Sequence, residues 1–230
     1  MSVRQKVPED LTARKALALE VIDRLKKEYP DAGCTLDYAH AWQLLVSVRL
    51  AAQCTDARVN IVVKDLFAKY PSVAALAAAE PEDIEAIVKP CGLGHSKARD
   101  ISACMRMLRD KYDCQVPATF EELLALPGVG RKSANLIMGD VFGKPAIVTD
   151  THCIRLCNRI GLVDGIKEPQ KVEMALWKII PPEEGSDLCH RFVMHGRAVC
   201  NARKPECEHC CLKAICRYAQ EQSDTQTAGS

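Results

Sequence analysis

Apolar residues recur along almost the whole chain at spacings of three and four, which is the period of an α-helix. Ile101, Cys104, Met105 and Leu108 follow this spacing, and Ser96 before them can cap the helix at its start. Similar patterns cover residues 10–28, short segments around 72–79 and 82–88, and most of the C-terminal third. The pattern predicts an all-α fold.

The boundaries of these helices are indicated by capping residues and prolines. A helix with Val172, Leu176 and Ile179 on one face should end before Pro181. Only residues 146–148 look strand-like, and they are too few to build a sheet. Residues 217–230 are polar and are expected to form a disordered tail. The candidate caps for the other helices are Thr35 and Asp37, Asp56, and Thr119 with Glu122.

A Pro-Gly-Val-Gly turn stands between two helical segments, residues 119–126 and 131–142. Gly128 and Gly130 permit positive φ, and their backbone N–H groups can face a phosphate while turn carbonyls hold a bridging cation. An ordinary corner between two helices is the alternative, but the following Arg131 and Lys132 favour the phosphate. The helix dipole disfavours the charged form of Lys132, so this amine is either a nucleophile or a phosphate contact.

Composition narrows the possible partners. The 230 residues include 31 Lys and Arg against 30 Asp and Glu, a formal net charge of +1. Bulk charge therefore gives no case for nucleic-acid binding, and basic groups would have to cluster on one face. No run approaches the roughly 20 apolar residues of a membrane span, and the N-terminus is charged. We expect a cytoplasmic protein with no membrane partner, whose 13 cysteines are mostly reduced.

Four cysteines near the C-terminus have the spacing C-x6-C-x2-C-x5-C. Zinc also takes four cysteines, but its sites more often use two close pairs, so an iron–sulfur cluster fits this spacing better. Cys211 could substitute for the adjoining Cys210 as a ligand. The segment between Cys200 and Cys207 carries Arg203 and Lys204, which either contact a phosphate backbone or are simply solvated. The four cysteines are Cys200, Cys207, Cys210 and Cys216.

These motifs, LPGVGRKSAN, then VTDTH, then the cysteine spacing, together resemble the helix–hairpin–helix DNA glycosylases with an iron–sulfur loop. The resemblance is closest to the endonuclease III family and extends from LAAQCTD near residue 50 to Cys216. It implies a two-lobed fold with DNA across the cleft. One lobe would be a six-helix barrel-like domain over 34–144 that contains the hairpin. The other would combine 1–33 with 145–216 and carry the cluster.

The resemblance also implies roles for single residues. Lys132 would be the catalytic nucleophile, and Asp150 the catalytic aspartate. From the sequence alone, Asp150 is equally a helix N-cap, and both roles can hold at once. The remaining matches are Gln53, which would fill the gap left by a flipped base, Leu93, which would wedge into the opposite strand, and Asp56 and His152, which would line or flank the pocket.

The implied activity is that of a bifunctional DNA glycosylase and abasic-site lyase that removes oxidised pyrimidines. Its implied cofactors are a [4Fe–4S] cluster and a monovalent cation at the hairpin, and its partner is damaged double-stranded DNA, bound by a monomer. A relative that removes mismatched adenine is the nearest alternative, but it lacks a lysine at the nucleophile position. A non-catalytic DNA-binding iron–sulfur module is the second alternative, and the presence of Lys132 with Asp150 argues against it.

Overall fold

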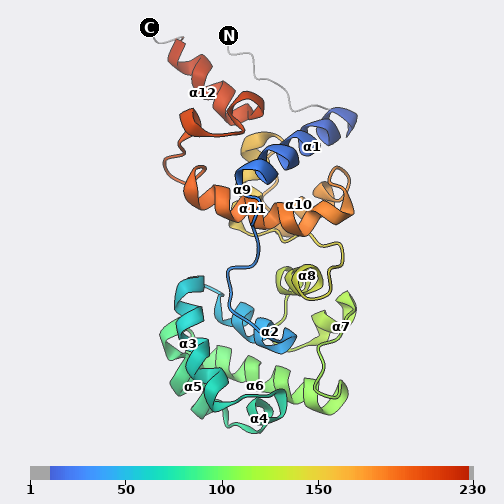
Figure 1. The fold of residues 1–230 in the computed structure, drawn as a ribbon, viewed down its shortest axis with the longest axis vertical. Coiled ribbons are helices and arrows are strands. Elements are labelled where there is room, and N and C mark those ends of the chain that lie inside the picture. The colour runs from blue at the N-terminus through green and yellow to red at the C-terminus, as the bar shows by residue number, and fades with distance from the viewer. Residues whose placement is uncertain (1–10, 228–230) are drawn as a thin grey trace. The chain divides into compact units, whose positions relative to one another are not determined.

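The computed structural model describes residues 11–227, and all of the regular structure in that range is helical, which confirms the predicted all-α fold (Figure 1). The longer helices are α1 (Leu11–Glu28), α2 (Ala41–Leu50), α3 (Asp56–Lys69), α6 (Gly94–Lys111), α8 (Arg131–Asp140), α9 (Thr151–Ile160), α11 (Gly185–Ala198) and α12 (Arg217–Thr227). The shorter ones are α4 (Val73–Ala78), α5 (Pro81–Val88), α7 (Phe120–Ala125) and α10 (Pro169–Leu176). Four 3₁₀ turns are η1 (Lys89–Cys91), η2 (Pro182–Glu184), η3 (Cys207–His209) and η4 (Lys213–Ile215).

The chain divides into two compact units. We call residues 34–144 the hairpin unit, and residues 1–33 with 145–230 the loop unit. The hairpin unit contains the seven helices α2 to α8, one more than the six expected, because even the short segments α4 and α7 close as separate helices.

In the hairpin unit, α6 packs against α4 and α5, α2 packs against α3, α6 and α8, and α7 packs against α8 (Figure 1). The apolar face predicted for α6 is buried, with Ile101, Met105 and Leu108 at most 2% exposed. The edge of the Trp42 ring meets Phe67 at a centroid distance of 5.1 Å. The hairpin therefore rests on a continuous hydrophobic core.

In the loop unit, α11 packs against α1 and α9, and α12 packs against α9 and η4. Two apolar runs fold differently from the sequence prediction. Residues 146–148 are buried without forming a strand, and a Cβ at Gly185 would lie 2.4 Å from the carbonyl oxygen of Ala146, so this run packs tightly against the start of α11. Helix α10 ends at Leu176, although Ile179 beyond it is still buried.

Two helix starts can be compared directly with the sequence prediction. Thr119 caps α7 as predicted, because its hydroxyl accepts a hydrogen bond from the Glu122 amide at 3.3 Å. The cap of α3 is Thr55, which accepts from the Arg58 amide at 3.3 Å. Asp56, the predicted cap, is instead the first residue of that helix. A threonine directly before an aspartate leaves the cap ambiguous by one residue.

Helix α2 has a cap that the pattern did not indicate. His40 occupies that position, and the Gln43 side chain accepts a hydrogen bond from the His40 amide at 3.0 Å. The predicted caps, Thr35 and Asp37, lie in the segment before the helix. The Thr35 hydroxyl instead donates to the carboxylate of Asp56 at 2.6 Å.

The predicted tail is partly ordered. Helix α12 covers residues 217–227, which corrects the expectation of a disordered segment, and residues 228–230 lie outside the described range. Three contacts explain the helix. Arg217 donates to the carbonyl of Asn158 at 2.7 Å, the Arg159 guanidinium lies 4.9 Å from the centroid of the Tyr218 ring, and Ala219 is buried. A polar composition hid these few anchoring residues.

Candidate functional site

The hairpin turn connects α7 to α8, and its two glycines have different reasons to be glycine. Gly128 has φ +74°, and a Cβ there would lie 2.8 Å from the Cβ of Asp100 and 3.1 Å from Cδ of Arg49. Gly130 caps α8 with φ −97°, and a Cβ would meet nothing within 4 Å. The positive φ expected at both glycines is therefore present only at Gly128. At Gly130 the empty space around the residue is what matters, because it leaves the start of α8 open.

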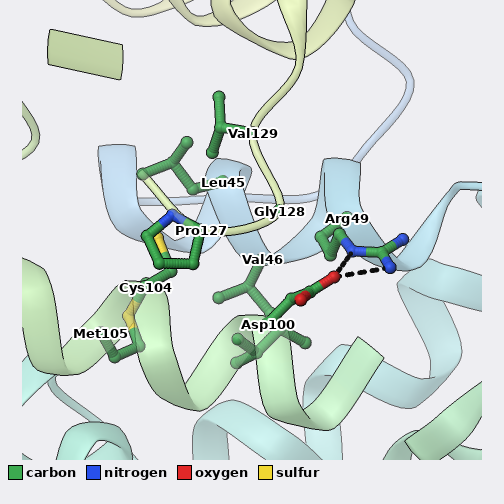
Figure 2. A pocket seen from close by; sticks show the side chains of 10 residues that line it. Leu45, Val46, Arg49, Asp100, Cys104, Met105, Pro127, Gly128 and Val129 are labelled. Carbon is green, nitrogen blue, oxygen red and sulfur yellow. Dashed lines mark hydrogen bonds and ion pairs between the residues drawn. The ribbon is translucent and has the colours of Figure 1, made fainter. Parts of the chain in front are cut away.

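Arg49 and Asp100 pack against the turn, and no local motif indicated them because they stand 51 residues apart in the chain. Figure 2 shows their ion pair beside Gly128, with Nε of Arg49 2.7 Å from the Asp100 carboxylate. The pocket between this pair, α6 and the turn holds about 10 Å³, enough for about one water. This pocket is too small for a nucleobase, so it serves the packing of the turn.

Lys132 is the second residue of α8, and its side chain is exposed. Arg131 before it lies over the ring of Phe120, with its guanidinium 5.0 Å from the ring centroid. The first turn of α8 therefore presents one amine to solvent and one guanidinium held against α7.

Gln53 and Leu93 share an uncommon backbone conformation. Their φ values are +58° and +51°, and both side chains are exposed, Leu93 by 58%. Left-handed backbone costs a non-glycine residue about 1–2 kcal/mol, and such strain clusters at functional sites. Leu93 is also the N-cap of α6, three residues before the predicted cap Ser96. We call these two residues the loop tips.

Asp150 is the N-cap of α9, as its alternative role predicted. Its Oδ1 accepts a hydrogen bond from the Cys153 amide at 2.7 Å. Two residues later, Nδ1 of His152 lies 3.1 Å from the Arg155 guanidinium. A Cβ at Gly196 of α11 would lie 2.5 Å from the same nitrogen, so α11 approaches the first turn of α9 closely. Asp150 and His152 thus lie on one fixed helix start.

The segment that carries the four cysteines, residues 200–216, follows α11, and we call it the cysteine loop. Side chains from α9 and α11 hold it in place. Arg159 donates to Cys200 Sγ at 3.3 Å and to the carbonyls of Asn201 and Ala202 at 2.8 and 2.9 Å. His195, which is 1% exposed, lies 3.3 Å from Cys210 Sγ through Nε2. Sequence reasoning missed both residues. In the sequence, the indication for Arg159 was that it follows Arg155 by four residues, which places both arginines on one face of α9. The Arg155 side chain also donates to this loop, at the carbonyl of Cys200.

The four predicted cysteine ligands influence one another. Burial, followed by the charges of Cys200 and Cys210, raises the pKa of the Cys207 thiol. Burial raises the pKa of Cys216 to about 11, and the charges of Cys210 and Cys200 act in the same direction. Among the described residues, however, no three Cys, His, Asp or Glu side chains gather closely enough to hold a single metal ion.

Arg203 and Lys204 lie in the same loop with exposed side chains. The Lys204 amide donates to the Asn201 side chain at 2.8 Å, which fixes the backbone directly below the two charges. Cys211, the possible substitute for Cys210, has its carbonyl held by Arg24 of α1 at 3.0 Å. Only Cys210 of this pair is bonded to His195.

Comparison with known proteins gives these features a family. Residues 46–182 match the model of the HhH-GPD superfamily of base excision DNA repair proteins. The chain is 43% identical over 211 residues to endonuclease III of Synechocystis, which covers 91% of this chain and 96% of the relative. It is 37% identical over 207 residues to endonuclease III of Escherichia coli K12, covering 90% and 98%. The chain belongs to the endonuclease III family.

A solved structure of an endonuclease III family member agrees with this assignment. It is described as a trapped covalent intermediate of endonuclease III with DNA, in an estranged-adenine complex. Its TM-score is 0.86 at 41% identity, and the match covers 91% of this chain and 98% of the other. The match to the superfamily model includes the loop tips, the hairpin and Asp150, and it ends before the four cysteines. Among the described residues, no helix is long and apolar enough to cross a membrane.

Proposed function

We propose that this chain removes oxidised pyrimidines, such as thymine glycol, from double-stranded DNA and then cuts the strand at the abasic site. As an endonuclease III family member, it is a bifunctional glycosylase and lyase of base excision repair. The observation that carries the proposal is Lys132, an exposed amine at the open start of α8. The relatives and the solved complexes named above support it. We further propose that it acts as a monomer in the cytoplasm.

Lys132 would act as the nucleophile. Its Nζ would form a bond to the sugar C1′, while the bond from C1′ to the base breaks and the base leaves with the electron pair. Ring opening and loss of a proton from nitrogen would give a Schiff base. Loss of a C2′ proton would then expel the 3′ phosphate by β-elimination, and water would release the lysine. An amine nucleophile thus accounts for both base removal and strand cleavage.

Asp150 would stabilise the positive charge that develops on the sugar, or accept a proton. One of its oxygens is used by the cap of α9. This bond fixes the orientation of the carboxylate. Asp56 and His152 would line or flank the pocket for the extruded base. Asp56 accepts a hydrogen bond from Thr35, and the His152 ring lies beside the Arg155 guanidinium.

The loop tips and the hairpin would hold the DNA. A base must leave the stack before it can react, at a cost of a few kcal/mol. Gln53 would fill the gap, and Leu93 would wedge into the opposite strand, in keeping with their exposure. Backbone amides at Gly128 and Gly130 would contact phosphate, Arg131 would add charge, and the turn carbonyls would hold a monovalent cation.

The cysteine loop fits a [4Fe–4S] cluster, with Cys200, Cys207, Cys210 and Cys216 as its ligands. The spacing C-x6-C-x2-C-x5-C contains one close pair of cysteines, whereas zinc sites more often use two such pairs. The cluster would fix the loop that carries Arg203 and Lys204 toward phosphate. Isolated protein should contain about four irons per chain. Zinc in place of iron would refute this assignment.

One of the four sulfurs, Cys210 Sγ, also has a ring N–H donor beside it. His195 lies between the Tyr29 hydroxyl, 3.1 Å from Nδ1, and Cys210 Sγ, 3.3 Å from Nε2. Burial raises the pKa of Tyr29 to about 12, so its hydroxyl keeps its proton and can donate to Nδ1. The other ring nitrogen then carries the hydrogen and donates to Cys210. A cluster ligand is stabilised by such N–H donors.

Covalent trapping tests the proposed reaction. Borohydride added during reaction with a thymine-glycol duplex should reduce the Schiff base and link the protein to DNA. Lys132→Ala should lower trapping by about 10³-fold or more, because the nucleophile is lost. Lys111→Ala, which removes an exposed lysine at the end of α6, is the matched control and should trap like the wild type.

Two results would refute the proposal. Equal trapping by Lys132→Ala would exclude this residue as the nucleophile. Base release from an adenine mismatch without trapping would instead support the adenine-removing relative.

A further inference from the structure

Lys97 is the one buried lysine among the described residues, with a relative exposure of 0%. It lies in the first turn of α6. This is an unfavourable place for a positive charge, because the N-terminal end of a helix dipole is itself positive. Burial also lowers the pKa of Lys97 below its ordinary value. A buried charge is retained only where specific partners compensate its desolvation.

The partners of Lys97 are two backbone carbonyls from different segments. Its Nζ donates to the carbonyl of Leu50 at 2.9 Å and to that of Cys91 at 2.8 Å. Leu50 is the last residue of α2, and Cys91 is the last residue of η1. Carbonyls at helix ends lack helical partners and attract a cation. The amine therefore joins two helix ends, and no ion pair with a carboxylate is found for it in residues 11–227.

Each of these helix ends leads directly into a loop tip. Gln53 follows Leu50 by three residues, and Leu93 follows Cys91 by two. Both tips have strained, left-handed backbone and exposed side chains. Strained residues keep their conformation only where the structure around them fixes it. The two hydrogen bonds of Lys97 are well placed to do so, because they hold both tips to the same side chain.

We propose that Lys97 is a positioning residue that sets the spacing of the two loop tips and so controls how the enzyme opens the DNA duplex. The inference rests on the proposed function, in which Gln53 and Leu93 enter the helix. Lys97 contacts neither DNA nor the reacting sugar. It acts by keeping the two insertions in register, so its loss should impair steps that need an opened duplex and spare chemistry on DNA that has no stack to open.

A ratio of two rates tests this role. The first is single-turnover excision from a thymine-glycol duplex, and the second is borohydride trapping on a single-stranded abasic oligonucleotide. Lys97→Met keeps the apolar stem and removes both hydrogen bonds. It should lower the ratio by about 10- to 100-fold, because a misplacement near 1 Å has costs of that size. Gln53→Ala and Leu93→Ala should lower the ratio in the same way.

Controls separate positioning from stability. Leu108→Ala removes a fully buried side chain at the far end of the same helix, and should lower the melting temperature while leaving the ratio unchanged. Adding Lys97→Met to Gln53→Ala should lower the ratio less than the two single effects combined, since coupled residues are not additive. If Lys97→Met does not fold, Lys97→Gln replaces it, with a smaller decrease expected because the amide can still donate to one carbonyl.

The outcomes are distinct. An unchanged ratio for the Lys97 variant, together with a lowered ratio for both tip variants, overturns the inference and leaves the proposed function intact. Unchanged ratios for Gln53→Ala and Leu93→Ala would instead refute the proposed role of the tips. Additive effects in the double variant would also overturn the inference, because Lys97 would then act independently of Gln53.

Discussion

The hairpin turn and the cysteine loop are both short segments without regular structure, yet different forces hold them. The turn is held by close packing, with Gly128 directly against Arg49 and Asp100. The loop is held by hydrogen bonds from charged and polar side chains, above all those of Arg159 and His195. The turn should therefore respond most to added volume, whereas the loop should respond most to lost donors.

This difference suits the proposed roles. Backbone amides that contact phosphate must be placed accurately without side-chain bulk, which close packing achieves. A loop that surrounds a cluster needs N–H donors around its sulfurs, which packing alone does not supply.

The largest expected effect comes from adding one methyl group to the turn. Gly128→Ala should lower the free energy of unfolding by about 3 kcal/mol, because it combines left-handed strain with a contact of 2.8 Å to Asp100. Gly130→Ala is the matched control and should change it by no more than about 0.5 kcal/mol, since its φ is ordinary and its surroundings are open. Urea unfolding of both variants measures the difference. Equal effects at the two glycines would contradict packing as the force that holds the turn.

The loop gives the next effect. Arg159→Leu keeps much of the apolar stem but removes the donors to Cys200 Sγ and to two loop carbonyls. We expect a loss of about 2 kcal/mol, the cost of leaving such acceptors without partners, and a lower iron content. Unfolding and iron analysis measure the two. Arg109→Leu, an exposed arginine paired with Asp110, is the control and should change neither. If Arg159→Leu retained wild-type iron and stability, the loop would not depend on its donors.

The same comparison explains what the sequence could reveal. The turn is encoded locally, in four consecutive residues, so its existence and place were predictable from the motif PGVG. The cap of α9 by Asp150 was predictable for the same reason. The supports were not, since Arg49 and Asp100 meet only after the chain has folded. The helix start at Leu93 was also missed, because its left-handed backbone breaks the usual capping rule.

In the loop, spacing revealed the four cysteines but not what surrounds them. Arg159 is separated from Cys200 by 41 positions and His195 from Cys210 by 15, and neither stands in a local motif. The helix α12 was missed because the contacts of Arg217 and Tyr218 anchor a segment whose composition is otherwise polar. Local sequence thus indicated the positions proposed to carry chemistry, whereas the residues that hold them in place become evident only from the fold.

The smallest effect concerns the exposed charges of the loop. Arg203→Ala and Lys204→Ala should leave stability almost unchanged, because both side chains are solvated, while each should reduce the salt dependence of DNA binding. Neutralising one phosphate releases about one counterion, so each substitution should lower the slope of log Kd against log salt by about 1. Lys111→Ala, outside the loop, should leave the slope unchanged. An unchanged slope for both loop variants would mean that the loop makes no contact with the DNA backbone. The hydrogen bonds from α9 and α11 would then serve only to organise the cysteines.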